Sequence, residues 1–459
     1  MLNLHLAMEK HNPKILCSQI DSMSDDPVLI KIEGLHPEKT YTLHSFAKPS
    51  SDLFECVVNY KADSQGVIDL DKSEATNGNY TGVEPMGIFW SMKPSPTNKN
   101  KYPRFAKLDV TTPLEVTLCI YDCEITFEQF QTMRTEKTLD KHKVASTVIN
   151  RWYMKPGTKR IKLSVKKHGV CGTLFIPSGK GPFPAVITMF GSHPGTMEYK
   201  ASLLASHGFA ALALAYFGAP GLPKLFLSVT EEWTLKLEYF ENAVKYLLNH
   251  EKVDAPSGVG VMVLSFSGFI GFAMATFIPE VKCLILQNAV THPAYVNLTY
   301  KGMTFAPENW EMSEDFEPNS DSSVLRGLCQ FFKSSYSLTA PGPEDLAMKF
   351  YDRKDVAYMF IASLDDENTP SEHYANRTQK LLQLAKHPNY VILRYPGAGH
   401  LLEPPYIVHH RSSVLKGTVG VESLLCWGGV ALPHCKAQED AWKKQIQFLR
   451  NNLVHCVKM

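Results

Sequence analysis

A buried strand that stops at a serine and continues as a buried helix is the feature that most constrains the fold of this chain. Residues 258–264 form an unbroken run of glycine and apolar side chains, which is typical of a strand covered on both faces. Two serines follow, Ser265 and Ser267, and the apolar stretch 269–277 is long enough for a helix. The pattern predicts a strand, a tight turn and a helix, with the hydroxyl of Ser265 presented at the turn.

A serine hydroxyl becomes a good nucleophile only when a neighbouring base takes its proton, so Ser265 needs a histidine and a carboxylate. Residues 390–395 alternate like a strand, and a Pro-Gly-Ala-Gly break stands directly before His400. Another apolar segment runs into an acidic loop, where Asp365 and Asp366 are both candidates for the carboxylate of the triad. Only one of them can accept from the imidazole. The order serine, acid, histidine is that of the α/β-hydrolases.

The turn departs from the G-x-S-x-G pattern at both flanks, where the chain has Val263 and Ser267, and the small residue has moved to Gly268. Such a turn forces strained backbone angles on the nucleophile and brings its flanks together. Val263 is therefore the harder substitution to accommodate. Ser267 is a rival nucleophile, although Phe269 would then occupy its downstream flank.

Two domains are expected from the change of pattern along the chain. Residues 1–150 carry short alternating segments separated by turn residues, which predicts an all-β, immunoglobulin-like sandwich. From about Lys155, buried strands alternate with helices, so residues 151–459 are predicted to form an α/β-hydrolase domain with a mostly parallel sheet. The expected strands are 28–33, 114–121, 185–190 and 210–215, the turns 63–66 and 76–79, and the helices 198–207, 231–249 and 438–453.

Composition excludes several classes of partner. The 459 residues carry a net charge of +1, which gives no reason to expect nucleic acid or an anionic membrane as a partner. No run of eighteen apolar residues is present, so neither a membrane span nor a secretory signal is expected. The cytosol is the expected compartment, because Val457-Lys458-Met459 is a poor peroxisomal signal. A monomer is slightly favoured.

The ten cysteines lack the spacing of a metal finger, so they are expected to be free thiols, and no metal site is predicted. The three N-x-S/T sequons at Asn79, Asn297 and Asn376 are then expected to be unused. Residues 300–346 are rich in Pro, Ser, Asn and acidic side chains, and either a lid over the site or a variable surface excursion would explain them. The basic run from Lys93 to Lys107 is equally well explained by a solvated loop, so it is not assigned to phosphate binding.

Several motifs resemble one family over nearly the whole chain, that of the type I acyl-CoA thioesterases and bile acid-CoA:amino acid N-acyltransferase. These motifs are Asp26-Pro-Val28, Glu33-Gly-Leu35, GVEPMGIFW at 82–90, Arg151-Trp-Tyr153, Phe190-Gly191, ASLLA at 201–205, LALAY at 212–216, YPGAGHLLEPPY at 395–406, and Trp427-Gly-Gly429 with His434, Ala437-Gln438 and Ala441-Trp442.

The resemblance implies that Ser265 is the nucleophile, Asp366 the acid and His400 the base. From the chemistry of such a triad, we expect the oxyanion to be bound by the backbone N–H of Phe266 and by one from the loop after Phe190-Gly191, that of Ser192. The substrate would be an acyl-CoA, and no cofactor is needed beyond the coenzyme A that the substrate brings. A hydrolase is favoured over an N-acyltransferase, because the transferase of this family uses a cysteine at the elbow where this chain has serine. A catalytically weak acyl-CoA binder is the non-enzymatic alternative, and a generic carboxylesterase is less favoured because of the β-rich leader.

Overall fold

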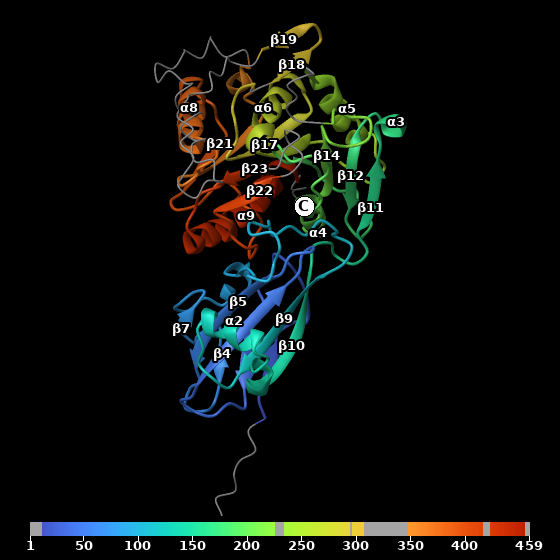
Figure 1. Cartoon of the computed structure of the whole chain (residues 1–459). Coiled ribbons are helices and arrows are strands. Elements are labelled where there is room, and N and C mark those ends of the chain that lie inside the picture. Colours follow the sequence, from blue (N-terminus) through green and yellow to red (C-terminus); the bar gives the residue numbers. More distant parts are fainter. Residues whose placement is uncertain (1–11, 225–233, 294–295, 307–347, 416–422, 455–459) are drawn as a thin grey trace, which may run out of the picture.

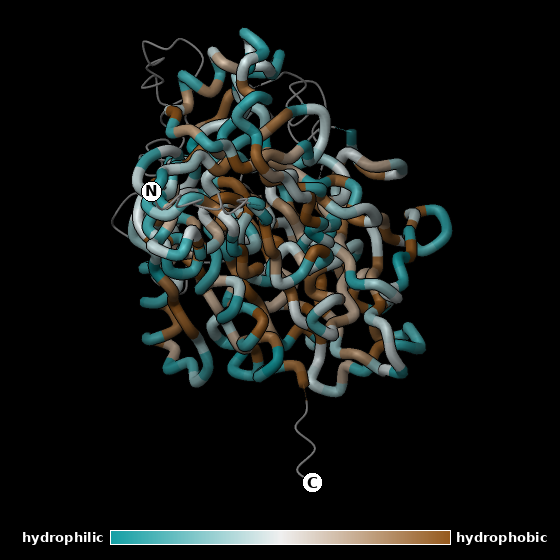
Figure 2. The backbone as a smooth tube through the Cα atoms, turned by 90° about the horizontal axis from the view of Figure 1, so that it is seen from below, coloured by the Kyte–Doolittle hydropathy of each residue, from teal (hydrophilic) through white to brown (hydrophobic). Residues whose placement is uncertain are grey.

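The computed structural model describes residues 12–224, 234–293, 296–306, 348–415 and 423–454. A β-rich part and an α/β part follow one another along the chain and lie end to end in Figure 1. Most of the segment 300–346, for which a lid is one prediction, lies outside the described residues, as do Val457, Lys458 and Met459. Figure 2 shows hydrophobic segments gathered toward the interior of the molecule, with hydrophilic loops around them.

The N-terminal part contains two sheets with the strand orders β1-β3-β6 and β2-β10-β9-β4-β5-β7, and β8 pairs with β5. All neighbouring strands in the two sheets are antiparallel except β2 and β10. The elements are β1 (Lys14–Cys17), β2 (Asp21–Met23), β3 (Ile30–Glu33), β4 (Thr40–Ala47), β5 (Phe54–Lys61), β6 (Ile68–Asp69), β7 (Ala75–Gly78), α1 (Gly87–Trp90), β8 (Lys93–Pro94), β9 (Leu114–Tyr121), α2 (Phe127–Thr135), the 3-10 helix η1 (Leu139–His142) and β10 (Lys143–Trp152).

Alternating side chains of the two sheets meet in one core. Ile30 and Ile32 of the small sheet are buried in the same cluster as Leu43, Val58 and Leu118 of the large one. The N-terminal part is therefore β-rich and two-layered, and an immunoglobulin-like strand order stays a prediction.

Residues 76–79 do not form the predicted turn. They lie in or directly after β7, which pairs with β5 across a register shift. The Asn-Gly pair instead belongs to an irregular strand. Gly78 has a φ of 127° there and packs against the backbone of Val57 and Val58.

The α/β part is built on an eight-stranded sheet with the order β11-β12-β14-β13-β16-β17-β20-β21. The strands from β14 to β21 are parallel, and β11 and β12 form an antiparallel edge. Their bounds are β11 (Lys159–Leu163), β12 (Cys171–Ile176), β13 (Ala185–Met189), β14 (Ala210–Ala215), β16 (Val259–Leu264), β17 (Val281–Gln287), β20 (Ala357–Ser363) and β21 (Tyr390–Tyr395). This is the mostly parallel sheet that the alternating pattern predicts.

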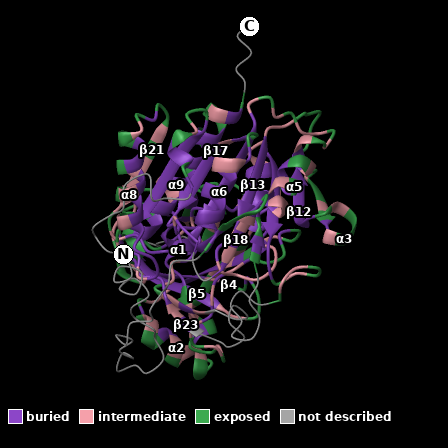
Figure 3. Ribbon diagram, turned by 90° about the horizontal axis from the view of Figure 1, so that it is seen from above, coloured by how far each residue is buried: buried purple, intermediate pink, exposed green. Residues whose placement is uncertain are grey.

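Helices cover both faces of this sheet, whose central strands are buried in Figure 3. Side chains of α4 (Tyr199–Ser206) and α9 (Ala431–Leu453) pack on one face, and those of α5 (Leu237–Leu248), α6 (Gly268–Phe277) and α8 (Ser371–Leu384) on the other. The remaining elements are α3 (Val165–His168), β15 (Thr234–Lys236), η2 (Ser265–Ser267), β18 (Asn297–Tyr300), β19 (Met303–Phe305), η4 (Phe350–Asp352), β22 (Ser412–Leu415) and β23 (Ser423–Cys426).

Two predicted helices have different starts in the structure. The helix expected from residue 231 begins at Leu237, because Thr234–Lys236 pair with β18 as the strand β15. The helix expected from residue 438 already begins at Ala431, with Pro433 in its first turn. Proline is tolerated there because the first N–H groups of a helix have no partner within the helix.

The two parts share a core. The cluster that fills the β-rich part continues into the sheet face under α4 and α9, and it includes Trp442 and Leu449. At the interface, Trp442 Nε1 donates to Asp25 Oδ2 at 2.8 Å and the Lys436 ammonium pairs with Glu84 at 2.7 Å. No helix in the described segments has the length and apolar character that crossing a bilayer requires.

Candidate active site

Ser265 lies on a sharp turn between β16 and α6. It begins the short helix η2 and has a φ of 59°, a left-handed conformation that costs energy for any residue with a Cβ. Its carbonyl oxygen accepts a hydrogen bond from the N–H of Val290 at 3.0 Å, which ties the turn to the loop after β17. A Cβ on Gly268 would lie 2.3 Å from the oxygen of Val290, so the shifted small residue is needed for this close approach. The predicted strand, turn and helix are confirmed.

Both departures from the elbow pattern are accommodated by specific neighbours. A Cβ on Gly271 would lie 3.0 Å from Cγ1 of Val263, so the missing side chain on α6 leaves the room that the valine occupies. The hydroxyl of Ser267 is fully buried and lies within hydrogen-bond distance of the N–H and the carbonyl of Leu264, at 3.1 and 2.9 Å. Ser267 therefore points back into the strand, and the structure does not favour it as the rival nucleophile.

Asp366 and His400 form a buried pair. Asp366 Oδ2 lies 2.8 Å from His400 Nδ1, and both side chains are 1 % exposed. The carboxylate also accepts from the backbone N–H groups of Asn368 and Thr369 and from the hydroxyls of Thr369 and Ser371, at 2.5 to 2.9 Å. A carboxylate in this network can only accept, so Nδ1 of His400 carries a proton, and in the neutral ring the lone pair is on Nε2. Such an imidazole can act as a general base.

Asp365 faces away from this pair. Its Oδ2 accepts from the N–H of Gly429 at 3.0 Å and lies 3.7 Å from the guanidinium of Arg411. Of the two adjacent aspartates, the structure thus brings only Asp366 to His400.

A second histidine, His434 on α9, holds the loop on both sides of His400. Its Nδ1 accepts from the N–H of Gly399 at 3.0 Å, and its Nε2 donates to the carbonyl of Leu401 at 3.1 Å. Burial lowers the pKa of His434 well below its usual value, so the ring stays neutral and can accept and donate at once. Asn288 adds a further bond from its Nδ2 to the carbonyl of His400 at 2.7 Å.

Trp427 connects the loop that carries His400, residues 396–411 (the histidine loop), to the turn at Ser265–Ser267 (the serine turn). Its ring stacks on that of His400, with centroids 5.7 Å apart and planes 11° apart, and its Nε1 donates to Ser413 Oγ at 2.7 Å. Leu264 and Leu401, the neighbours of Ser265 and His400, are buried with Trp427 in one small cluster. The serine turn and the histidine loop are therefore packed against each other.

The loop after β13 crosses directly beside the serine. A Cβ on Gly191 would lie 2.8 Å from Cβ and 3.2 Å from Oγ of Ser265. The hydroxyl of Tyr216 lies 2.5 Å from the carbonyl oxygen of Gly191, and its ring stacks on Phe266 with centroids 6.4 Å apart. In a trans peptide the N–H of Ser192 points opposite to the carbonyl of Gly191, hence away from Tyr216. The buried Tyr216 thus contacts Phe266, one predicted oxyanion donor, and the peptide between Gly191 and Ser192, which carries the other.

Sequence reasoning did not assign roles to His434, Asn288, Thr369, Ser371 and Tyr216. Thr369 and Ser371 stand close to Asp366 in the sequence, and hydroxyls directly after a candidate acid are a signal that could have pointed to them. His434 and Gly399 are 35 residues apart and meet only in the fold.

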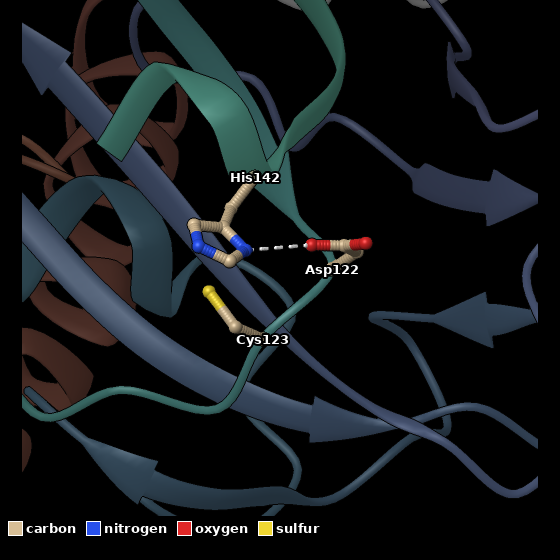
Figure 4. Close-up of side chains that lie close together, drawn as sticks. All are labelled: Asp122, Cys123 and His142. Atoms are coloured by element: carbon tan, nitrogen blue, oxygen red, sulfur yellow. Dashed lines mark hydrogen bonds and ion pairs between the residues drawn. The ribbon is translucent and has the colours of Figure 1, made fainter. Parts of the chain in front are cut away.

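A separate group of potential metal ligands lies in the β-rich part. Asp122, Cys123 and His142 offer ligand atoms that all lie within 4.8 Å of one another, and in Figure 4 the sulfur of Cys123 points toward the ring of His142. All three are half-buried. The carboxylate already has two partners, since His142 Nδ1 lies 3.1 Å from Oδ1 and the Lys39 ammonium 3.8 Å from Oδ2. These contacts account for the group without a metal, and we assign none to it.

Two family models match this chain, one in each of its two parts. The family model described as acyl-CoA thioester hydrolase/BAAT N-terminal region matches residues 25–165, and the model described as BAAT / acyl-CoA thioester hydrolase C terminal matches residues 235–455. Among solved structures, a dienelactone hydrolase-like promiscuous phosphotriesterase aligns with 64% of this chain and 98% of its own at 14% identity, with a TM-score of 0.39.

Relatives of two activities align over nearly the full length. Acyl-coenzyme A thioesterase 3 of Mus musculus is 35% identical over 94% of this chain and 92% of its own. Acyl-coenzyme A thioesterase 1 of Homo sapiens is 36% identical over 94% of each chain. Bile acid-CoA:amino acid N-acyltransferase of Mus musculus is 34% identical over 96% of this chain and 98% of its own. The chain therefore belongs to the family of acyl-CoA thioester hydrolases and bile acid-CoA:amino acid N-acyltransferases.

Proposed function

We propose that this protein hydrolyses acyl-CoA to a free acid and CoA through an acyl-enzyme on Ser265. One observation carries the proposal: a serine with a φ of 59° stands at the end of β16, in the fold that also holds the buried pair of Asp366 and His400. Membership of the family adds the substrate class, because its members include acyl-CoA thioesterases.

In the acylation step His400 Nε2 removes the proton of Ser265 as Oγ attacks the thioester carbonyl. Asp366 fixes the tautomer of the imidazole and stabilises the imidazolium that forms. The tetrahedral oxyanion is bound by the backbone N–H groups of Phe266 and Ser192, as the placement of Gly191 beside Ser265 favours. The C–S bond then breaks, and CoA leaves as a thiolate, which needs little help from an acid because a thiol has a pKa of about 8.5. The proton that His400 took from Ser265 passes to this thiolate or to solvent, so the imidazole is neutral again before the second step.

In the second step His400 activates a water molecule, which attacks the ester carbonyl. The C–O bond to Ser265 breaks, the proton returns to the serine and the acid leaves. If an amino acid amine attacked instead, the product would be an amide, and relatives with this activity make the transferase the second candidate. The serine favours water, because an oxygen ester is less selective for amines than the thioester formed on a cysteine. On the sequence alone we keep the cytosol as the proposed compartment and a monomer as the proposed state.

The deciding experiment is incubation of the purified protein with a panel of acyl-CoAs, with and without glycine or taurine, with all products read by mass spectrometry. We expect free acid and CoA at a rate that does not depend on the amine. An N-acyl amino acid as main product would replace the hydrolase with the transferase, which needs an ordered amine site to outcompete water. Saturable binding without either product would identify an acyl-CoA binder.

The nucleophile is tested separately with a fluorophosphonate probe. It should label the wild type on Ser265 and fail to label Ser265→Ala, whereas Ser267→Ala should still be labelled because the hydroxyl of Ser267 is turned into the strand. Labelling that survives Ser265→Ala and is lost in Ser267→Ala would move the nucleophile.

A further inference from the structure

A single arginine of the β-rich part reaches both loops of the candidate active site. Arg104 lies in the connection between β8 and β9, and its Nη2 donates to Glu403 Oε1 at 2.7 Å. Glu403 stands three residues after His400 in the histidine loop. On the other side the guanidinium carbon lies 4.9 Å from the centroid of the Phe190 ring, where a cation is attracted to the aromatic face. Phe190 directly precedes Gly191, which lies against Ser265.

The contact is largely removed from water. The side chains of Arg104 and Glu403 are 13 % and 7 % exposed. Tyr199 donates to the other carboxylate oxygen at 2.6 Å, and the Lys200 ammonium lies farther away, at 3.5 Å. A charge pair in such surroundings is held strongly in one geometry, and removal of Arg104 leaves the buried Glu403 to Tyr199 and the more distant Lys200 ammonium.

The chain on either side of Arg104 contacts the histidine loop and the strand β22 that follows it. The N–H of Phe105 donates to Nε2 of His410 at 2.9 Å, and the N–H of Val414 donates to the carbonyl of Tyr102 at 3.1 Å. His410 must be neutral to accept this bond, and burial does lower its pKa to about 3. Residues 102–105 therefore follow the loop that carries His400 rather than a distant part of the sheet.

We infer that Arg104 is a positioning residue that joins two loops, the histidine loop through Glu403 and the loop after β13 through Phe190. Through this contact the β-rich part sets the distance between base and nucleophile. The inference rests on the proposed serine triad, not on the identity of the acyl group. It also gives Arg104 a role other than phosphate binding, since its charge is already engaged inside the protein.

The test compares Arg104→Met and Arg104→Lys with Arg134→Met in the full-length protein. Arg134 forms an equivalent pair with the buried Glu55 at 2.8 Å in the β-rich part, so its loss serves as the matched control for stability. Amide hydrogen exchange of residues 190–193 and 401–411 should rise tenfold or more in Arg104→Met and stay unchanged in Arg134→Met, although both proteins melt at lower temperature. Arg104→Lys keeps a cation for Glu403 but loses the planar face over Phe190, so faster exchange is expected mainly in residues 190–193.

Turnover gives the second measurement. In Arg104→Met we expect kcat to fall tenfold to a hundredfold with KM within about threefold, because misplacement of reacting groups by an ångström has effects of this size. Unchanged exchange in both loops, together with a melting temperature lowered as in Arg134→Met, would reduce Arg104 to a structural residue. If Arg104→Met does not fold, Arg104→Lys carries the same comparison. Hydrogen exchange needs no substrate, so it decides the role of Arg104 even if the acyl-CoA panel shows no product.

Discussion

Two adjacent aspartates in one acidic loop have different surroundings. The side chain of Asp366 is 1 % exposed and accepts from two backbone N–H groups, two hydroxyls and the imidazole of His400. The side chain of Asp365 is 40 % exposed and faces Gly429 and Arg411. The sequence limits the candidates for the triad acid to these two aspartates. The direction of the backbone at the end of β20 decides which of the two carboxylates faces His400.

Asp366→Asn should therefore lower kcat by about 10⁴, because the amide can donate to Nδ1 of His400 and so favours the wrong tautomer. Asp365→Asn should change kcat by less than about threefold. Steady-state hydrolysis of an acyl-CoA by both variants checks this ranking, and circular dichroism shows whether each is folded. The reverse order would mean that the other aspartate holds the base.

His434 gives a second prediction at this scale. His434→Leu removes the acceptor for Gly399 and the donor for Leu401, so the loop around His400 loses both supports. We expect kcat to fall by at least tenfold. His434→Gln offers a carbonyl and an N–H₂ group and should recover much of that loss, as measured by the rate of fluorophosphonate labelling. Equal labelling rates in His434→Leu and wild type would exclude a role in positioning.

Among the elements, the serine turn shows how a valine fits where a glycine is usual. Val263, the last residue but one of β16, lies next to Gly271, one turn into α6. The valine occupies the space that a side chain on Gly271 would need. Single-sequence reasoning identifies the departure at Val263, but not its compensation, because the pair meets only when the helix folds back on the strand.

Gly271→Ala tests this compensation. The added Cβ would lie 2.9 Å from Leu284 Cδ1 and 3.0 Å from Val263 Cγ1, so we expect a loss of about 1–3 kcal/mol in the free energy of unfolding. Val263→Ala in the same chain should recover part of it, because the two changes share one contact. Urea denaturation of the two single variants and the double variant gives the coupling. Additive losses would show that Val263 and Gly271 do not share the space.

The sequence predicts those elements that apolar runs and breaks define locally, such as β16, α6, β21 and the turn at His400. It does not predict the start of α9 at Ala431, because Pro433 suggests a break although proline is permitted in a first turn. The supports of the site, among them Tyr216 and His434, are joined by contacts over 25 to 35 residues. No local pattern encodes such contacts.

For the whole molecule, buried neutral histidines predict sensitivity to acid. Burial, with neighbouring cations, lowers the pKa of His193 to about 4 and of His292 and His410 to about 3. An unfolded histidine has a pKa of about 6.5, so between pH 6.5 and 4 the unfolded chain binds more protons than the folded one. This contribution to stability is complete above pH 6.5 and is lost as the pH falls.

We expect the free energy of unfolding to fall below pH 6.5 by up to about 1.4 kcal/mol per pH unit for each of these histidines. Urea denaturation at pH 7.5, 6 and 5 measures the slope. His410→Gln keeps an acceptor for the N–H of Phe105 and should make the slope shallower by about one proton. A stability that does not change between pH 7.5 and 5 would contradict the prediction.

The position of α9 also bears on how the molecule is made. This helix covers the central sheet, contacts the β-rich part through Trp442 and Lys436, and carries His434 beside His400. Every other described element leaves the ribosome before it. Until residues 431–453 have been synthesised, the apolar face under α9 stays exposed, and the histidine loop lacks the hydrogen bonds that His434 makes to Gly399 and Leu401. A nascent chain stalled short of α9 should therefore need protection by chaperones and should not react with an active-site probe.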